Sequence, residues 1–414
     1  MSQPVHLPAY QPLRIIHESR RVPKWGKTFT ETRSLAQNEL FLQVRERCRH
    51  MLSSTSRFPS NVNAMKKIFY SISLILIAGW INFVFAAVKT GGMIRGSIWV
   101  ANEGGNSITV ISAGTNKVTA TLSGIGGPHN LQVSPDGKSV WVVSGHGSKA
   151  IMIDGTTYKV HGAVPTGNHP AHIIVTPDGK RVYVTNGEDN TVSVIDVDRM
   201  SPLRTIPVGQ YPHGLRPSPD GKRVFVANVK SDSLSVIDTA SDTKITDISV
   251  GKNPVQVAFS PDGRFVYASL NGENALVKVD VEKLAVIDKV KVGIGPVQVA
   301  VTPDNTRVVV ANQGTEQQPS TTVSVVDVQT FSVTDTVETG KGAHGVVIDP
   351  SGAYAFITNI YGNDVSVVDL SIRKTIAKIP TGEKPNGISF STMESPTPSK
   401  PVINFSIEGH ETKH

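Results

Sequence analysis

The clearest copy of a repeated unit runs from Pro170 to Asn186 and has the sequence PAHIIVTPDGKRVYVTN. The proline of its Thr-Pro-Asp-Gly turn is Pro177. Together with its counterparts in the other units it gives the series 135, 177, 219, 261, 303 and 350, with intervals of 42, 42, 42, 42 and 47 residues. A fixed period of about 42 residues is typical of an array of identical supersecondary units. The repeat therefore decides the fold of most of this 414-residue chain.

Each unit contains four short apolar segments rich in Val and Ile, separated by clusters of turn residues. In the clearest copy these segments are 171–175, 181–185, 192–195 and 203–208. Short alternating or continuous apolar runs of this length predict strands, and the Pro-Asp-Gly sequence predicts a tight turn between the first two. Four antiparallel strands in about 40 residues are typical of a propeller blade.

The units add up to seven blades. Three strands, at 97–101, 108–111 and 118–122, precede the first complete unit, and a single first strand, at 385–390, follows the last. Together they make one further blade from both chain ends, which leaves no open sheet edge in the ring. We therefore predict an all-β, seven-bladed β-propeller over residues 97–391. Its six complete units begin at Pro128, Pro170, Pro212, Pro254, Pro296 and Ala343.

The second strand carries a family signature. Val182-Tyr183-Val184-Thr185-Asn186 resembles the YVTN β-propeller repeat, and variants stand at 224–228, 308–312 and 355–359. The resemblance covers residues 97–391. Within the family the sequence is similar to the periplasmic YncE-type members and, more distantly, to haem d1-binding propellers. It implies fold more than function, because propellers host binding, scaffolding and catalysis alike.

The N-terminal segment predicts export. Met65-Lys66-Lys67 is followed by an uncharged stretch at 68–87, and Val84-Phe85-Ala86 suits a cleavage site. This pattern predicts a signal peptide at 65–86 and a periplasmic or secreted protein. The alternative is a membrane anchor, if the segment at 68–87 stays uncleaved. Residues 1–64 form a basic extension outside the repeat, either an over-extended start of translation or a tail ahead of the anchor.

The charge of the mature part argues against nucleic acid as a partner. The whole chain has a formal net charge of +7, but residues 1–67 hold 12 of its Lys and Arg and only 4 of its acidic residues. The rest is nearly neutral, whereas a non-specific nucleic-acid binder needs a basic surface. The only cysteine, Cys48, lies in the extension, so the propeller has no disulfide. Residues 392–414 are expected to be a flexible tail, although 402–407 has the pattern of one more strand.

Polar residues surround one end of the predicted central channel. The first strand of each blade lines this channel, so the residues just after its opening position face the channel mouth. We take this mouth as the candidate ligand site, with four of its histidines as candidate metal ligands. The residues are His129, His172, His213, His344, Asn386, Gln256 and Gln298.

Converging imidazoles are the ligands that a transition metal or haem iron requires, so the possible cofactors are a metal ion or haem. Two other interpretations stay open: a polar mouth for a small ligand, and a purely structural role. His172 stands one residue later in its unit than His129, His213 and His344. The five extra residues around 314–320 lie on the same face, where insertions in repeat proteins often mark the binding side.

The remaining repeated polar residues are expected to build the blades. The Pro-Asp-Gly aspartates and those that end the third strands fit turn caps, and the asparagines that end the second strands are expected to be turn residues. No Gly-x-Ser-x-Gly, P-loop, Cys-x-x-Cys-His or HExxH motif is present. The sequence thus favours a monomeric, non-enzymatic binding or scaffold propeller with a protein or small-molecule ligand at the histidine face. The alternatives are a haem- or metal-handling propeller and a lactonase-type hydrolase.

Overall fold

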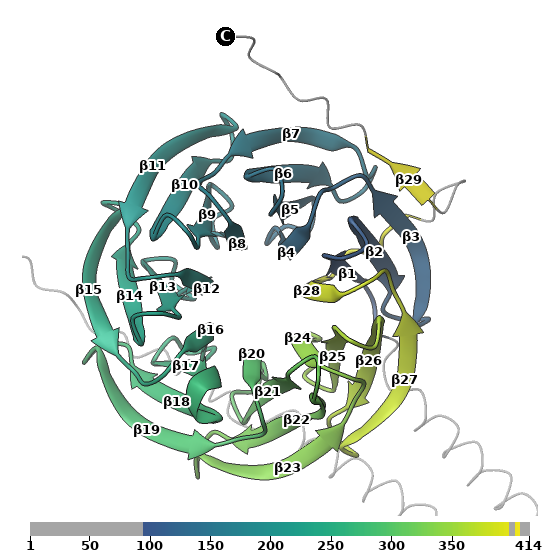
Figure 1. Cartoon of the computed structure of the whole chain (residues 1–414). Coiled ribbons are helices and arrows are strands. Elements are labelled where there is room, and N and C mark those ends of the chain that lie inside the picture. Colours follow the sequence, from purple (N-terminus) through teal and green to yellow (C-terminus); the bar gives the residue numbers. More distant parts are fainter. Residues whose placement is uncertain (1–93, 397–401, 406–414) are drawn as a thin grey trace, which may run out of the picture. The chain divides into compact units, whose positions relative to one another are not determined.

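The computed structural model describes residues 94–396 and 402–405, which form seven blades arranged around a central axis (Figure 1). Each blade is an antiparallel sheet whose first strand is innermost and whose fourth is outermost. This arrangement confirms the predicted all-β, seven-bladed propeller. The extension at 1–64 and the signal peptide or anchor at 65–86 lie outside the described residues. None of the helical segments in the described ranges has the length and apolar character needed to cross a bilayer.

The inner half of each blade consists of its first and second strands. The first strands, in blades 1 to 7, are β4 (Pro128–Val133), β8 (Pro170–Val175), β12 (Pro212–Pro217), β16 (Pro254–Phe259), β20 (Pro296–Val301), β24 (Ala343–Ile348) and β28 (Pro385–Ser391). The second strands are β5 (Ser139–Ser144), β9 (Arg181–Asn186), β13 (Arg223–Asn228), β17 (Phe265–Leu270), β21 (Arg307–Gly314), β25 (Tyr354–Asn359) and β1 (Ser97–Asn102).

The outer half consists of the third and fourth strands. The third strands are β6 (Lys149–Asp154), β10 (Thr191–Asp196), β14 (Ser233–Asp238), β18 (Ala275–Asp280), β22 (Pro319–Asp327), β26 (Asp364–Asp369) and β2 (Ser107–Ser112). The fourth strands are β7 (Val160–Pro165), β11 (Ser201–Pro207), β15 (Thr243–Ser249), β19 (Ala285–Lys291), β23 (Ser332–Glu338), β27 (Lys374–Pro380) and β3 (Lys117–Ser123). One 3-10 turn, η1 (Asn271–Glu273), connects β17 and β18.

Apolar side chains between neighbouring blades form the core. The middle of the second strand holds a large, fully buried side chain in most blades, as at Trp141, Tyr183 and Phe225. One cluster combines Trp99 of blade 7 with Val140 and Ile151 of blade 1. The core is thus divided among the interfaces between blades, so each blade depends on its neighbours for burial.

Repeated polar residues fix the turns and the strand pairs. Ser134 Oγ and Lys138 N both donate to Asp136 Oδ1, at 2.6 and 3.0 Å, and four further blades repeat this capped turn. Asn186 does more than the turn role expected of it. Its Nδ2 donates to Thr191 Oγ1 at 3.0 Å and to Ser193 Oγ at 2.9 Å, which ties the second strand to the third. A side chain can make both contacts because alternate residues of β10 face it.

The ring closes where the two ends of the propeller meet. Strand β28 pairs antiparallel with β1, with Val100 opposite Ile388 and Ile98 opposite Phe390. Blade 7 therefore has the strand order β28-β1-β2-β3, as the sequence predicted. Because the first and last strands complete one sheet, the closure joins residues that are almost 300 positions apart.

Part of the C-terminal segment adds a strand outside blade 7. Strand β29 (Val402–Asn404) pairs parallel with β3, which is the added strand that the sequence analysis left open for 402–407. Phe405 N also donates to Ser123 O at 2.7 Å. Earlier in the same segment, Tyr158 Oη donates to the carbonyl of Pro396 at 2.6 Å, which connects the segment to blade 1.

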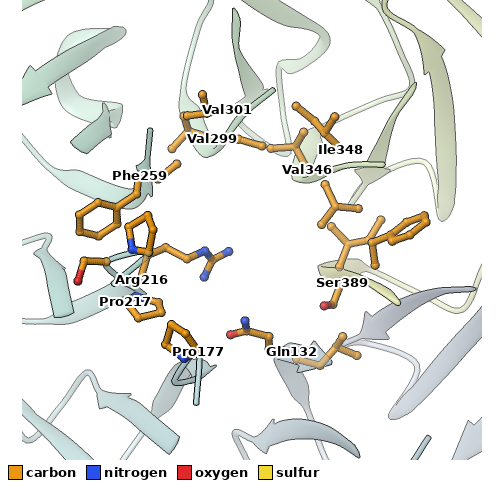
Figure 2. A pocket seen from close by; sticks show the side chains of 18 residues that line it. Gln132, Pro177, Arg216, Pro217, Phe259, Val299, Val301, Val346, Ile348 and Ser389 are labelled. Carbon is orange, nitrogen blue, oxygen red and sulfur yellow. The ribbon is translucent and has the colours of Figure 1, made fainter. Parts of the chain in front are cut away.

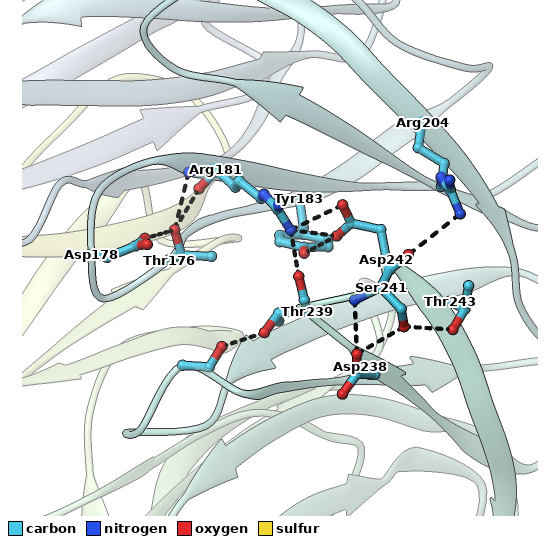
Figure 3. A network of polar contacts seen from close by, with 11 residues as sticks. Thr176, Asp178, Arg181, Tyr183, Arg204, Asp238, Thr239, Ser241, Asp242 and Thr243 are labelled. Carbon is cyan, nitrogen blue, oxygen red and sulfur yellow. Dashed lines mark hydrogen bonds and ion pairs between the residues drawn. The ribbon is translucent and has the colours of Figure 1, made fainter. Parts of the chain in front are cut away.

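A polar network around the buried side chains of Tyr183 and Asp242 joins blades 2 and 3 on the face opposite the histidines (Figure 3). The guanidinium of Arg181 contacts both carboxylate oxygens of Asp242, at 3.0 and 2.9 Å, and Tyr183 Oη donates to Asp242 Oδ1 at 2.5 Å. Arg181 also donates to the carbonyl of Thr239. Because Asp242 is only 9% exposed, these contacts link the blades where water competes least.

We predict that a chain ending at Gly382 loses cooperative unfolding, because blade 7 then lacks its innermost strand and Ile98 and Val100 lose their partners. A chain ending at Pro396 keeps β28 and loses only β29, so its unfolding temperature should stay within a few degrees of the full chain. Thermal unfolding followed by circular dichroism distinguishes them. Equal, cooperative transitions in the full chain and the Gly382 truncation would contradict the role of the closure.

We predict that Asp242→Ala lowers the free energy of unfolding by about 2 kcal/mol, because it leaves Arg181 and Tyr183 without their shared acceptor. Lys222→Ala is the matched control. It removes an exposed pair with Asp220, in which the Lys222 side chain is 80% exposed, and should change stability by less than about 0.5 kcal/mol. Urea unfolding measures both. A similar change in the two variants would show that the network contributes no more than a surface pair.

Candidate functional site

Three histidines from neighbouring blades meet at the channel mouth. His129 of β4, His172 of β8 and His213 of β12 each bring one ring nitrogen within 4.8 Å of the other two. The ring centroids of His172 and His213 lie 4.5 Å apart. Among the described residues this is the one group of His, Cys, Asp or Glu side chains close enough to share a metal ion. His344, the fourth candidate ligand, is outside this group.

Glu103 holds His129 in place. Glu103 lies in the loop after β1, and its Oε1 accepts a hydrogen bond from His129 Nδ1 at 3.0 Å while its Oε2 accepts one from Asn386 Nδ2 at 2.9 Å. Burial by itself raises the pKa of Glu103, but the hydrogen bonds with His129 and Asn386 and the charge of His129 outweigh it and lower this pKa to about 2. A carboxylate on Nδ1 places the remaining lone pair of His129 on Nε2, as in carboxylate–histidine–metal sites.

His213 presents its Nε2 to the same point. Its Nδ1 donates to the carbonyl of Val255 at 3.1 Å, so its lone pair also lies on Nε2. The Nε2 atoms of His129 and His213 are 3.2 Å apart. Two lone pairs at this distance repel each other unless a proton or a cation lies between them. The arrangement is therefore one that a shared cation stabilises.

In His172 the roles of the two ring nitrogens are exchanged, so that Nδ1 accepts a hydrogen bond and Nε2 carries the proton. Its Nδ1 accepts from Gln256 Nε2 at 3.1 Å, and the Gln256 amide is oriented by Val257 N, which donates to its Oε1 at 2.9 Å. His172 consequently carries its proton on Nε2, and this buried N–H has no protein acceptor. Gly214 makes this contact possible, because a Cβ there would come within 2.3 Å of Gln256 Oε1.

His344 belongs to a separate contact across the mouth. Its Nδ1 donates to Gln313 Oε1 at 3.0 Å, and Gln313 Nε2 donates to Tyr361 Oη at 2.8 Å. Gln313 lies at the end of β21, where the five extra residues of blade 5 lengthen the hairpin and pair Gly314 with Pro319. The side chain that reaches His344 thus comes from the residue directly before the insertion. The Nε2 of His344 is buried and has no hydrogen-bond partner. The same holds for Gln298 Nε2 and Asn386 Oδ1.

The threonine of the family signature positions the site. Thr185 Oγ1 accepts from His172 N at 3.0 Å and donates to the carbonyl of His213 at 2.7 Å. Thr358 acts likewise, accepting from Gly345 N at 2.6 Å and donating to the carbonyl of Asn386 at 3.0 Å. Each hydroxyl joins the first strands of two consecutive blades. The backbone that carries the site side chains is thereby fixed by hydrogen bonds from the second strands.

His172 and His213 stay neutral at ordinary pH, because their pKa values are lowered. Burial, with the nearby charge of His129, lowers the pKa of His213 to about 3, although its bond to Val255 opposes the shift. Burial and the charges of His213 and His129 likewise hold the pKa of His172 well below its usual value. Neutral imidazole is the form that binds metal, so no proton has to leave these two rings first.

Neither Glu103 nor Gln313 was among the site residues predicted from the sequence. Both occupy the position directly after the asparagine that ends the second strand, where blades 1 and 2 have Gly145 and Gly187. A register comparison of the units could have found them, because this position lies on the histidine face and is polar in only some blades. The distance from each loop to the mouth, however, depends on the tertiary fold.

Comparison with known proteins agrees with the repeat. Residues 174–289 match the family model of the YNCE-like β-propeller, which confirms the resemblance drawn from the YVTN signature. The chain resembles the YncE-like propellers. Residues 242–350 match the model of the seven-bladed lactonase propeller, a region that contains none of the three clustered histidines. No curated protein matches the chain.

Several solved structures share the fold. Hydrazine synthase of Kuenenia stuttgartiensis is 25% identical, with a TM-score of 0.58, over 64% of this chain and 89% of its own. A putative 6-phosphogluconolactonase from Bacteroides uniformis is 18% identical, with a TM-score of 0.61, over 72% and 99%. The dihydro-haem d1 dehydrogenase NirN is 16% identical, with a TM-score of 0.56, over 71% and 74%. At these identities the last two show the fold alone.

We predict that stability falls as the pH drops below about 6.5, because burial lowers the pKa of His344 to about 4 in the folded protein. The unfolded chain binds a proton near pH 6.5 and the folded chain does not, so this stability is present above 6.5 and is lost toward pH 4. Urea unfolding in EDTA between pH 7.5 and 4.5 measures the loss. His344→Asn should reduce the slope of the free energy of unfolding against pH by up to about 1.4 kcal/mol per pH unit. An unchanged slope would contradict the neutral state of His344.

Proposed function

We propose that the protein is a binding propeller whose channel mouth holds a divalent transition-metal ion through His129 and His213. The supporting observation is the 3.2 Å separation of two Nε2 atoms whose Nδ1 atoms are each fixed by an acceptor, Glu103 in one case and Val255 in the other. Two nitrogens bound to one tetrahedral zinc ion lie about 3.3 Å apart, which is close to this spacing.

The same distance favours a small ion over haem. The two axial ligands of a haem iron stand on opposite sides of the metal, which places their nitrogens about 4 Å apart. His129 and His213 are too close for that arrangement and fit adjacent positions on one ion. Imidazole ligands suit Zn²⁺, Cu²⁺ and Ni²⁺, so these are the ions that we propose.

His172 completes the site as a hydrogen-bond donor. Its proton is on Nε2, so it does not ligate the ion while Gln256 occupies its Nδ1. Its N–H has no protein partner and is available to a water or an anion on the metal. Two nitrogen ligands leave coordination positions open, so the ion would accept an external ligand. We therefore propose a metal-dependent binding site for a small ligand or for a donor side chain of a partner protein.

The proposal includes export and excludes nucleic acid as the main partner. Export rests on the sequence pattern at 65–86, and the near-neutral charge of the propeller argues against non-specific nucleic-acid binding. A lactonase-type hydrolase is the second candidate, because residues 242–350 match the seven-bladed lactonase model. A metal ion with open coordination positions also activates water. An assay of lactone hydrolysis therefore distinguishes the binding protein from the hydrolase.

We predict that calorimetric titration with Zn²⁺ gives one site per chain, and that His129→Ala and His213→Ala each weaken binding at least 100-fold. Glu103→Gln should weaken it about 10-fold, because it removes the partner that orients His129. His146→Ala is the matched control, an exposed histidine outside the cluster, and should leave the affinity unchanged. Equal Zn²⁺ affinity in the His129→Ala variant and the unaltered protein would remove this site.

The same samples test the lactonase alternative. Zn²⁺-dependent hydrolysis of 6-phosphogluconolactone that disappears in His129→Ala and persists in His146→Ala would replace the binding role with a catalytic one. Metal binding without hydrolysis is the outcome that we expect.

A further inference from the structure

The opposite end of the central channel differs in character from the histidine mouth. There the inner strands approach the Pro-Asp-Gly turns and surround a cavity of about 460 Å³. Much of its wall is apolar, and Val299, Val301, Val346 and Ile348 line it from two successive blades (Figure 2). Phe259 lines it from the blade before, but its ring packs on Phe225 with the ring centroids 5.3 Å apart. A concave apolar space of this size is within the usual range of small-molecule sites, about 300–1,000 Å³.

One cation lies in this apolar cavity. Arg216, near the end of β12, extends its guanidinium toward the middle of the channel (Figure 2). Its Nη1 donates to the carbonyl of Leu215 at 2.9 Å, and none of the carboxylates in the described residues lies within ion-pair distance of it. Burial lowers the pKa of Arg216 to about 10, which still leaves it protonated at neutral pH. Arg216 is half-buried, and a partly desolvated charge without a counter-ion is stabilised when an anion joins it.

Two neutral side chains also offer donors to this cavity. Gln132 Oε1 accepts from Val175 N at 3.2 Å, which turns the amide nitrogen of Gln132 into the channel. Ser389 Oγ accepts from Val133 N at 3.1 Å, so its hydroxyl hydrogen is free to donate. Arg216, Gln132 and Ser389 come from blades 3, 1 and 7, and all three line the same cavity. Each of these three side chains can therefore offer a donor to the cavity.

We propose that this cavity binds a small amphipathic carboxylate, with its carboxylate on Arg216 and its apolar part against the Val and Ile side chains of blades 5 and 6. A planar guanidinium matches a carboxylate through two parallel hydrogen bonds, and Gln132 and Ser389 are further donors on the wall of the same cavity. A monoanion is favoured over a phosphate dianion, because one cation neutralises one charge and the second would remain uncompensated among apolar walls.

This site is independent of the metal site. His213 and Arg216 are three residues apart on β12, which corresponds to about 10 Å along a strand. The two sites therefore open toward opposite ends of one channel, and either can exist without the other. The test of the carboxylate site is done in EDTA, so that its outcome does not depend on metal binding.

Calorimetric titration with octanoate tests the proposal. We expect one octanoate per chain. Acetate, inorganic phosphate and 1-octanol should each bind at least 10-fold more weakly, because acetate lacks the apolar part, phosphate lacks the apolar part and the single charge, and 1-octanol lacks the charge. Arg216→Gln should weaken octanoate at least 10-fold, and Arg216→Lys should weaken it less, because it keeps the charge and loses the bidentate geometry. Arg264→Gln is the matched control: it removes the same charge from an exposed turn on this face of the propeller.

Three results would overturn the proposal. Equal binding of octanoate and 1-octanol would show an apolar cavity without an anion site, and equal binding of octanoate and phosphate would show a site for the charge alone. Unchanged octanoate affinity in Arg216→Gln would place the ligand elsewhere. If Arg216→Gln fails to fold, the comparison of octanoate with 1-octanol on the unaltered protein still decides, because the two differ at the charged group.

Discussion

The pairing of β28 with β1 is the constraint on which the rest of the structure depends. The core lies between blades, so the blades at the two ends of the repeat array bury their apolar faces only when the ring closes. The channel exists only because seven first strands converge on one axis. Closure joins the two ends of the propeller in one sheet, and the mouth residues Asn386 of β28 and Glu103 after β1 reach His129 through that sheet.

Hydrogen bonds from the repeat then fix the geometry of the mouth. Thr185 belongs to the family signature, and its hydroxyl joins the backbone of two successive first strands that carry His172 and His213. The residue that makes the blade recognisable is therefore also a positioning residue of the site. This explains how a repeated scaffold holds non-repeated side chains at fixed distances: the backbone contacts recur, and the side chains at the channel mouth vary.

The two ends of the channel have opposite chemistry. Ring nitrogens with free lone pairs meet at one end, where a cation is favoured, and an unpaired guanidinium with neutral donors lies at the other, where an anion is favoured. Strand β12 contributes to both ends through His213 and Arg216. His129, His213 and Arg216 are half-buried, so each polar atom left without a partner carries part of a desolvation cost that a bound ligand would offset.

The sequence by itself determined the architecture, because a 42-residue period records each blade and the incomplete units at the two ends require closure. It also placed the seven candidate residues at one channel mouth, since strand direction assigns them to a face. Only the tertiary structure decided that His129, His172 and His213 meet while His344 pairs with Gln313, and that Glu103 and Arg216 take part. These outcomes depend on which side chains cross the axis between blades and on which nitrogen each hydrogen bond leaves free, and the repeat period specifies neither.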